Sequence, residues 1–186
     1  MMMDLTNSAL LLLRLALGLV AIGHGVQKIS YHLGGGGLEA EAAVLAKDGV
    51  RGGRLSAAAS GVTQIGAGFL CCLGLLTPLG AAGIIGVMFV ATFTKLHNGF
   101  WVQNDGCEFP LFLAVMGAVL ALSGPGSWSL DHLVPLHRTV ATSVGAIALG
   151  VVSGLVSAPL LRQGHRSLAG SNTDGDPAGP GLTKTS

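Results

Sequence analysis

Long apolar runs separated by short polar segments dominate the hydrophobic pattern of this chain. A helix that spans the hydrocarbon core of a bilayer needs about 20 mostly apolar residues. Runs of about that length predict four transmembrane helices within residues 1–131 and a fifth within 132–162. The expected spans are about 8–29, 56–76, 79–96, 108–123 and 139–161, and a polar tail at 163–186 is expected to be disordered.

Residues that favour turns separate these runs. Pro78 follows the second run and suits the first turn of the third helix, because a proline there needs no intrahelical hydrogen bond. Gly124-Pro125-Gly126 closes the fourth run. Between the first two spans, LEAEAAVLAK at 38–47 follows four glycines and predicts a short interfacial or re-entrant helix.

Composition supports an all-α membrane protein, a four-helix transmembrane bundle with a fifth transmembrane helix. The chain is 50% hydrophobic and 10% charged, whereas soluble domains carry about 25% charged residues. The 30 glycines suit close packing between membrane helices. Because the formal net charge is only +1, the chain lacks the electrostatic footprint of a nucleic-acid-binding protein.

The lysines and arginines predict an orientation in the membrane. Five spans place the N-terminus, the turn at 77–78 and the loop at 124–138 on one face, and the other loops and the tail on the opposite face. Since loops rich in Lys and Arg stay in the cytoplasm, we expect an N-terminus outside the cell and a cytoplasmic C-terminus. The first face holds Arg14 and Arg138, and the second holds Lys28, Lys47, Arg51, Arg54, Lys95, Arg162, Arg166 and Lys184.

Polar residues from all four core helices converge on the predicted cytoplasmic end. Taken singly, each has an ordinary structural interpretation, such as a helix-end charge or an interfacial aromatic. Taken together, they predict a quinone headgroup site, a small-anion site or a structural ion-pair network. The residues are His24, Lys28, Gln64, Lys95, His97, Trp101 and Glu108. His24, His97 and Glu108 could ligate a metal, and the two histidines a haem. Since no dense ligand motif is present and the lysines oppose a cation, we expect no metal.

Arg14 and Asp131 form a second candidate group at the opposite end. Arg14 lies about two turns inside the first span, and Asp131 returns to the same face after the fourth span. Because an ionised group inside a membrane is costly without a partner, we expect an Arg14–Asp131 ion pair that clamps the bundle.

The series LLLRLALGLVAIGHGVQKI, GAGFLCCLGLLTP, HNGFW and GCEFPLFLAVMGAVLALSGPGSWSLD resembles the DoxX family of small bacterial membrane proteins. The resemblance runs from about Leu10 to Asp131 and implies a four-helix membrane bundle. The family's polar positions fall on Arg14, His24, Gly25, Lys28, Gly99, Phe100, Glu108 and Asp131. Gln64 stands where the family commonly has a glutamate, which argues against a relay of two carboxylates. The fifth helix and the tail extend beyond the usual core.

The resemblance implies a function in redox homeostasis in the bacterial inner membrane. The family is named after a subunit of an archaeal thiosulfate:quinone oxidoreductase, and actinobacterial relatives are linked to superoxide dismutase and sulfurtransferase partners. We therefore expect an accessory oxidoreductase subunit rather than a stand-alone enzyme, with a quinone as the candidate cofactor. The alternatives are a non-catalytic scaffold that docks a partner through its fifth helix and a transporter of a small anion; a homo-oligomer is compatible with each.

Overall fold

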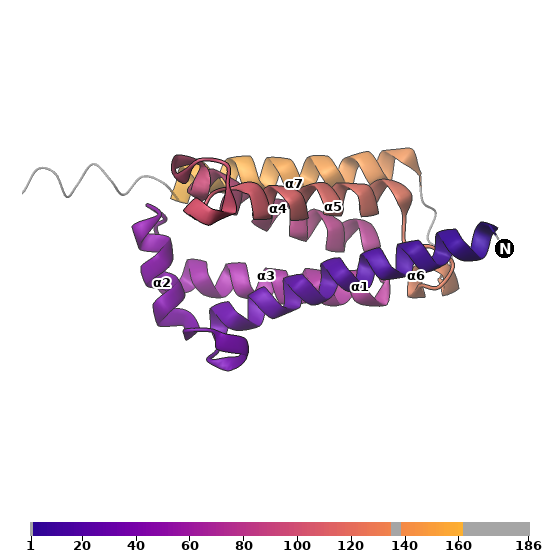
Figure 1. Ribbon diagram of the computed structural model, residues 1–186. Helices are drawn as coiled ribbons and strands as arrows, with labels where there is room; N and C mark the ends of the chain where they lie inside the picture. Colours follow the sequence, from indigo (N-terminus) through magenta and orange to yellow (C-terminus); the bar gives the residue numbers. More distant parts are fainter. Residues whose placement is uncertain (1, 135–138, 162–186) are drawn as a thin grey trace, which may run out of the picture.

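The computed structural model describes residues 2–134 and 139–161, and all of its regular secondary structure is helical. Five long helices lie side by side along one axis (Figure 1). They are α1 (Met2–Ile29), α3 (Gly53–Leu73), α4 (Thr77–Lys95), α5 (Glu108–Ser123) and α7 (Val140–Leu161). The shorter elements are η1 (His32–Gly34), α2 (Gly37–Lys47), η2 (Leu96–Asn98), η3 (Val102–Asn104) and α6 (Leu130–Leu133).

Each expected span coincides with a helix, although α3 begins and ends three residues before the expected 56–76 and α1 begins before residue 8. Four of them, α1, α3, α4 and α7, are long and apolar enough to cross a membrane. The remaining helix, α5, is the fourth along the chain of the five expected spans. It has 16 residues and is about 24 Å long at 1.5 Å per residue, less than the roughly 30 Å of a hydrocarbon core. The 96–107 loop, which contains η2 and η3, joins α4 to the start of α5. The predicted helix at 38–47 is also confirmed, as α2.

The two ends of the bundle differ in what covers them. At one end lie the N-terminus, the α3–α4 turn and α6 (Figure 1). At the other end, α2 lies across the bundle beside the ends of α1 and α3, and we call this the α2 end. Arg138, Arg162, Arg166, Lys184 and the tail at 163–186 lie outside the described residues, so the predictions made for them stay predictions.

Glycines set the closest helix contacts. An added Cβ at Gly25 of α1 would lie 2.6 Å from the carbonyl oxygen of Gly61 in α3, and one at Gly68 would lie 2.6 Å from that of Gly18. On α7, an added Cβ at Gly154 would lie 2.5 Å from the Cβ of Phe89 in α4. Only a residue without a side chain allows such an approach. An added Cβ at Gly150 would likewise lie 2.8 Å from the carbonyl oxygen of Ala82, so α7 packs on α4 through two glycines four residues apart.

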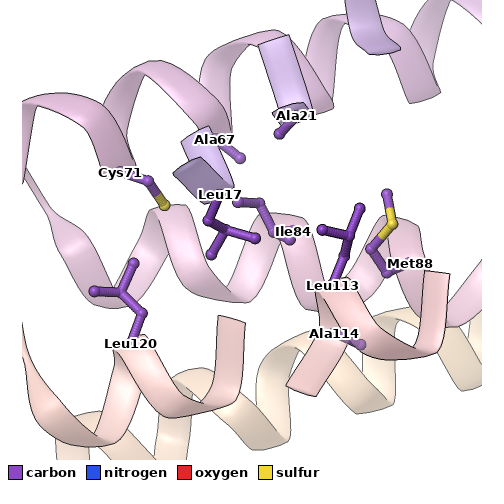
Figure 2. Close-up of a cluster of buried hydrophobic side chains, with 9 residues drawn as sticks. All are labelled: Leu17, Ala21, Ala67, Cys71, Ile84, Met88, Leu113, Ala114 and Leu120. Atoms are coloured by element: carbon purple, nitrogen blue, oxygen red, sulfur yellow. The ribbon is translucent and has the colours of Figure 1, made fainter. Parts of the chain in front are cut away.

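Between these contacts lies an apolar core to which α1, α3, α4 and α5 all contribute (Figure 2). Apart from Met88, its residues are small or branched, which lets side chains of facing helices fill the space between the backbones. The members are Leu17, Ala21, Ala67, Cys71, Ile84, Met88, Leu113, Ala114 and Leu120. This core separates the polar groups of the two ends.

Candidate ligand cavity at the α2 end

A cavity of about 640 Å³ lies between α2 and the bundle, with residues of α1, α2, α3, α4 and α7 in its walls. Pockets for small molecules have volumes of about 300–1,000 Å³. Part of the lining is aliphatic and comes from Val44, Leu45, Val50, Val87 and Val90. The polar part includes His24, Gln27, Lys28, Glu41, Asp48, Ser60, Thr63, Thr94 and Lys95. The cavity thus presents an apolar surface and charged groups to the same space.

Both lysines of the cavity are paired with carboxylates. Lys28 Nζ donates a hydrogen bond to Glu41 Oε1 of α2. Lys95 Nζ lies 3.9 Å from Asp48 Oδ2, at the end of α2, and 2.6 Å from Asp105 Oδ1 in the 96–107 loop. Because each positive charge faces a negative one, the cavity has little excess charge to attract an anion.

His24 connects the cavity to α5. Its imidazole lines the cavity, and it also packs edge-on against the ring of Phe109, with the ring centroids 5.3 Å apart. On the same helix, Gln27 Nε2 donates to the carbonyl oxygen of Leu33 at 2.7 Å, which holds the chain between α1 and α2. The last turns of α1 therefore supply both a histidine in the cavity wall and an anchor for the segment between α1 and α2.

The structure brings only part of the predicted site into the cavity. His24, Lys28 and Lys95 line it, whereas His97, Trp101 and Glu108 belong to the 96–107 loop and the start of α5 and do not line it. His97 Nδ1 lies 2.7 Å from the carbonyl oxygen of Thr94, and Trp101 is exposed. No group of three or more His, Cys, Asp or Glu within the described ranges is placed to hold a metal ion.

Gln64 is buried in α3. It is 2% exposed, and its Oε1 has no hydrogen-bond partner among the described residues. Thr63, its neighbour in sequence, lines the cavity, but Gln64 itself does not. A buried polar atom without a partner costs about 1–3 kcal/mol, so the burial of this oxygen is not compensated by the described residues.

Glu108 has a local partner rather than a lysine. Its Oε2 accepts a hydrogen bond from the backbone N–H of Val102 at 3.0 Å, and its own N–H donates to the carbonyl oxygen of Phe100 at 2.8 Å. The carboxylate thus closes the loop that precedes α5. The carboxylates that compensate Lys28 and Lys95 are instead Glu41, Asp48 and Asp105, which the sequence reasoning missed. The acids in and just after the predicted helix at 38–47 were the available signal.

Comparisons with known proteins agree with this architecture. A family profile described as DoxX matches residues 9–97. An "Uncharacterized membrane protein Rv3486" of Mycobacterium tuberculosis is 31% identical over 140 residues, which cover 68% of this chain and 82% of that protein. The chain belongs to the DoxX family. No solved structure matches it.

The DoxX segment contains nearly the whole cavity. Every lining residue lies within residues 9–97, with the single exception of Ser157 on α7. This DoxX protein is thus a multi-pass integral membrane protein of a bacterial family. Its first four α-helices, α1 to α4, and the segments that join them supply nearly all of the candidate site.

Arg14 and Asp131 lie at the opposite end of this DoxX protein, and each takes backbone partners. Arg14 is 1% exposed, and its Nη1 and Nη2 donate to the carbonyl oxygens of Pro125 at 2.8 Å and Trp128 at 2.6 Å. The guanidinium therefore ties α1 to the loop between α5 and α6, in place of the direct ion pair with Asp131 that we expected.

Asp131 caps the start of α4. Its Oδ1 and Oδ2 accept from the backbone N–H groups of Leu76 at 2.7 Å and Thr77 at 2.9 Å, and its own N–H donates to the carbonyl oxygen of Gly74 at 2.8 Å. A carboxylate at a helix N-terminus satisfies free N–H groups and complements the helix dipole. Together, Arg14 and Asp131 link α1, the α3–α4 turn and α6 at this end.

Proposed function

We propose that this DoxX protein binds a small, uncharged amphiphile of the quinone class in the α2 cavity, as the membrane subunit of a redox complex. The observation that carries the proposal is the lining of the cavity, which joins an aliphatic surface to paired charges at one end of a transmembrane bundle. Ligand sites typically combine a mostly apolar wall with a few placed polar groups.

The cavity lining fits a quinone in three respects. Valines of α2 and α4 offer an apolar surface for a ring and the start of an isoprenoid chain. Lys28 and Lys95 carry N–H donors for ring oxygens, while their carboxylate partners leave the site nearly neutral, which favours an uncharged headgroup over an anion. A bound quinone would supply two-electron, two-proton chemistry.

His24 is the residue we assign to proton handling in the proposed site. It is the single histidine among the residues that line the cavity, and an imidazole exchanges protons near neutral pH. Glu108, which the sequence analysis singled out, bonds to its own loop, so its proposed contribution is to shape that loop beside Phe109 and His24.

We place the protein in the inner membrane with the α2 end in the cytoplasm. Among the described residues, that end carries Lys28, Lys47, Arg51, Arg54 and Lys95, and lysines and arginines near the membrane favour the cytoplasmic side. This orientation would expose the site to cytoplasmic oxidoreductase partners. The family resemblance suggests superoxide dismutase or sulfurtransferase subunits as such partners.

A quinone titration tests the ligand class. Purified protein in nanodiscs is mixed with a soluble naphthoquinone or, as the control, with sulfate, and its unfolding temperature is followed. A ligand at 100 times its Kd stabilises the folded state by about 2.7 kcal/mol. The proposal predicts stabilisation by the quinone and none by sulfate. Stabilisation by sulfate alone would show that the protein binds an anion and would refute the quinone proposal.

A scaffold is the second candidate, and a specific observation favours it. The ion pairs of the α2 end satisfy one another without any ligand, as a purely structural network would. Native mass spectrometry of gently extracted protein separates the two functions. A bound lipid-soluble molecule supports the quinone site, and a stoichiometric partner protein with an empty cavity supports the scaffold.

A further inference from the structure

Ion pairs hold α2 on the bundle, and apolar burial contributes little. Within α2, Gly37 is the one residue that is fully buried. Acids of α2 and its C-terminal flank reach a different bundle helix each: Glu41 pairs with Lys28 of α1, Glu39 with Arg54 of α3 at 3.0 Å, and Asp48 with Lys95 of α4 at 3.9 Å. A helix with few buried apolar contacts has a low local free energy of opening.

Glycines flank α2 on both sides. Four consecutive glycines, residues 34–37, lead into α2, whose first residue is Gly37, and Gly34 and Gly37 have φ values of +77° and +73°. After it, Gly49, Gly52 and Gly53 have φ values of +76°, +95° and +50°. Glycine adopts this left-handed region at no steric cost and can leave it as easily. Both connections of α2 can therefore rotate without straining a side chain.

We propose that α2 is a hinged cover, which opens to admit a ligand to the cavity and is latched by the Lys28–Glu41 and Lys95–Asp48 pairs. Glu41 and Asp48 both line the cavity, so the latch pairs form part of the wall that α2 contributes. The identity of the ligand rests on the proposed function above, whereas the movement of the cover does not.

The latch pairs differ in burial from the third pair. The side chains of Lys28 and Glu41 are 21% and 17% exposed, and those of Lys95 and Asp48 are 24% and 7% exposed. Arg54 and Glu39 are 68% and 67% exposed. An exposed pair contributes little because water and salt screen it, and a partly buried pair contributes more. Removal of the two latch pairs should therefore favour opening, and removal of the exposed pair should not.

Hydrogen–deuterium exchange in nanodiscs tests the cover without any ligand. The variant Glu41→Gln/Asp48→Asn keeps the shapes of both side chains and removes their charges. We expect amide exchange in α2 to rise roughly 10-fold, which corresponds to ~1.4 kcal/mol, while exchange in α3 and α4 stays unchanged. The matched control Glu39→Gln should change exchange in α2 less than about twofold.

Two results would overturn the proposal that α2 is a hinged cover. One is unchanged exchange in α2, and the other is an equal rise in α2, α3 and α4, which would mean a general loss of stability. A charge exchange serves as rescue: Glu41→Lys alone should raise exchange in α2, and Lys28→Glu/Glu41→Lys should restore protection. Failure of the double variant to restore it, with the bundle still folded, also counts against the latch.

The association rate of the naphthoquinone separates this inference from the proposed function. Faster association with Glu41→Gln/Asp48→Asn supports the cover as the entrance. If exchange in α2 rises but the quinone does not bind, the proposed movement of α2 is supported and the proposed quinone function is refuted. If the quinone binds while exchange in α2 stays unchanged, the proposed quinone function is supported and the proposed movement of α2 is refuted.

Discussion

Asp131 is expected to be the most costly single carboxylate to remove from this protein. Its two oxygens accept from the N–H groups of Leu76 and Thr77, and Thr77 is 1% exposed. Asp131→Ala leaves both N–H groups without this acceptor at the start of α4. It also removes the carboxylate that lies near the buried charge of Arg14.

The magnitude follows from these contacts. Loss of an N-cap side chain costs about 0.5–2 kcal/mol, and a hydrogen bond to a charged group contributes about 1.5–3 kcal/mol. Because such terms overlap, we expect Asp131→Ala to lower the free energy of unfolding by about 2–4 kcal/mol. This corresponds to a roughly 30- to 700-fold change in the unfolding equilibrium. Asp131→Asn keeps one acceptor oxygen and should cost about half as much.

Reversible unfolding by SDS in mixed micelles, followed by circular dichroism, measures these differences. The matched control is Asp105→Ala, which removes an aspartate whose side chain is 69% exposed in its pair with Lys95 and should cost about 0–1 kcal/mol. The reasoning is refuted if Asp131→Ala unfolds like the wild type, or if Asp105→Ala is the more damaging of the two.

Three further predictions concern other parts of the fold. Gln64→Met should raise the free energy of unfolding of the purified protein by about 1 kcal/mol, because it removes a buried oxygen that has no hydrogen-bond partner among the described residues. A clear loss of stability would contradict this. Gly25→Ala should lower the free energy of unfolding by about 1–3 kcal/mol, because its Cβ would lie 2.6 Å from the carbonyl oxygen of Gly61. A Cβ at Gly23 meets nothing within 4 Å, so the control Gly23→Ala should be neutral or stabilising. Equal effects of the two substitutions in the same SDS titration would refute the contact. Lys47→Cys should escape a membrane-impermeant maleimide in intact cells and react after permeabilisation, measured against the native-cysteine background; labelling in intact cells would reverse the proposed orientation.

The spans could be predicted from sequence because each depends on local properties. The length and hydropathy of a run decide whether it crosses a bilayer, and the breakers at Pro78 and Gly124–Gly126 lie at helix ends in the structure. The convergence of His24, Lys28 and Lys95 on one end could also be predicted, because alternate spans return to the same face.

The partners of those residues could not be predicted from span topology. Glu41 and Asp48 reach Lys28 and Lys95 only because α2 folds back across the end of the bundle, and that placement depends on tertiary contacts. Glu108 begins α5 at the same end as the lysines, so span topology alone groups it with them. The 96–107 loop turns back toward it, however, so the nearest donor is the N–H of Val102.

A matched pair of cavity variants tests most directly whether the α2 cavity is the ligand site. Ala91 lines the cavity, so Ala91→Phe places a ring where it can take up part of that space, whereas Ala148→Phe adds the same ring to an exposed face of α7. Naphthoquinone affinity is measured by isothermal titration calorimetry on folded protein in nanodiscs. If the α2 cavity is the ligand site, Ala91→Phe raises the Kd at least 10-fold, or ~1.4 kcal/mol, and Ala148→Phe leaves it unchanged. Equal affinity for both variants would mean that the quinone does not bind in the α2 cavity.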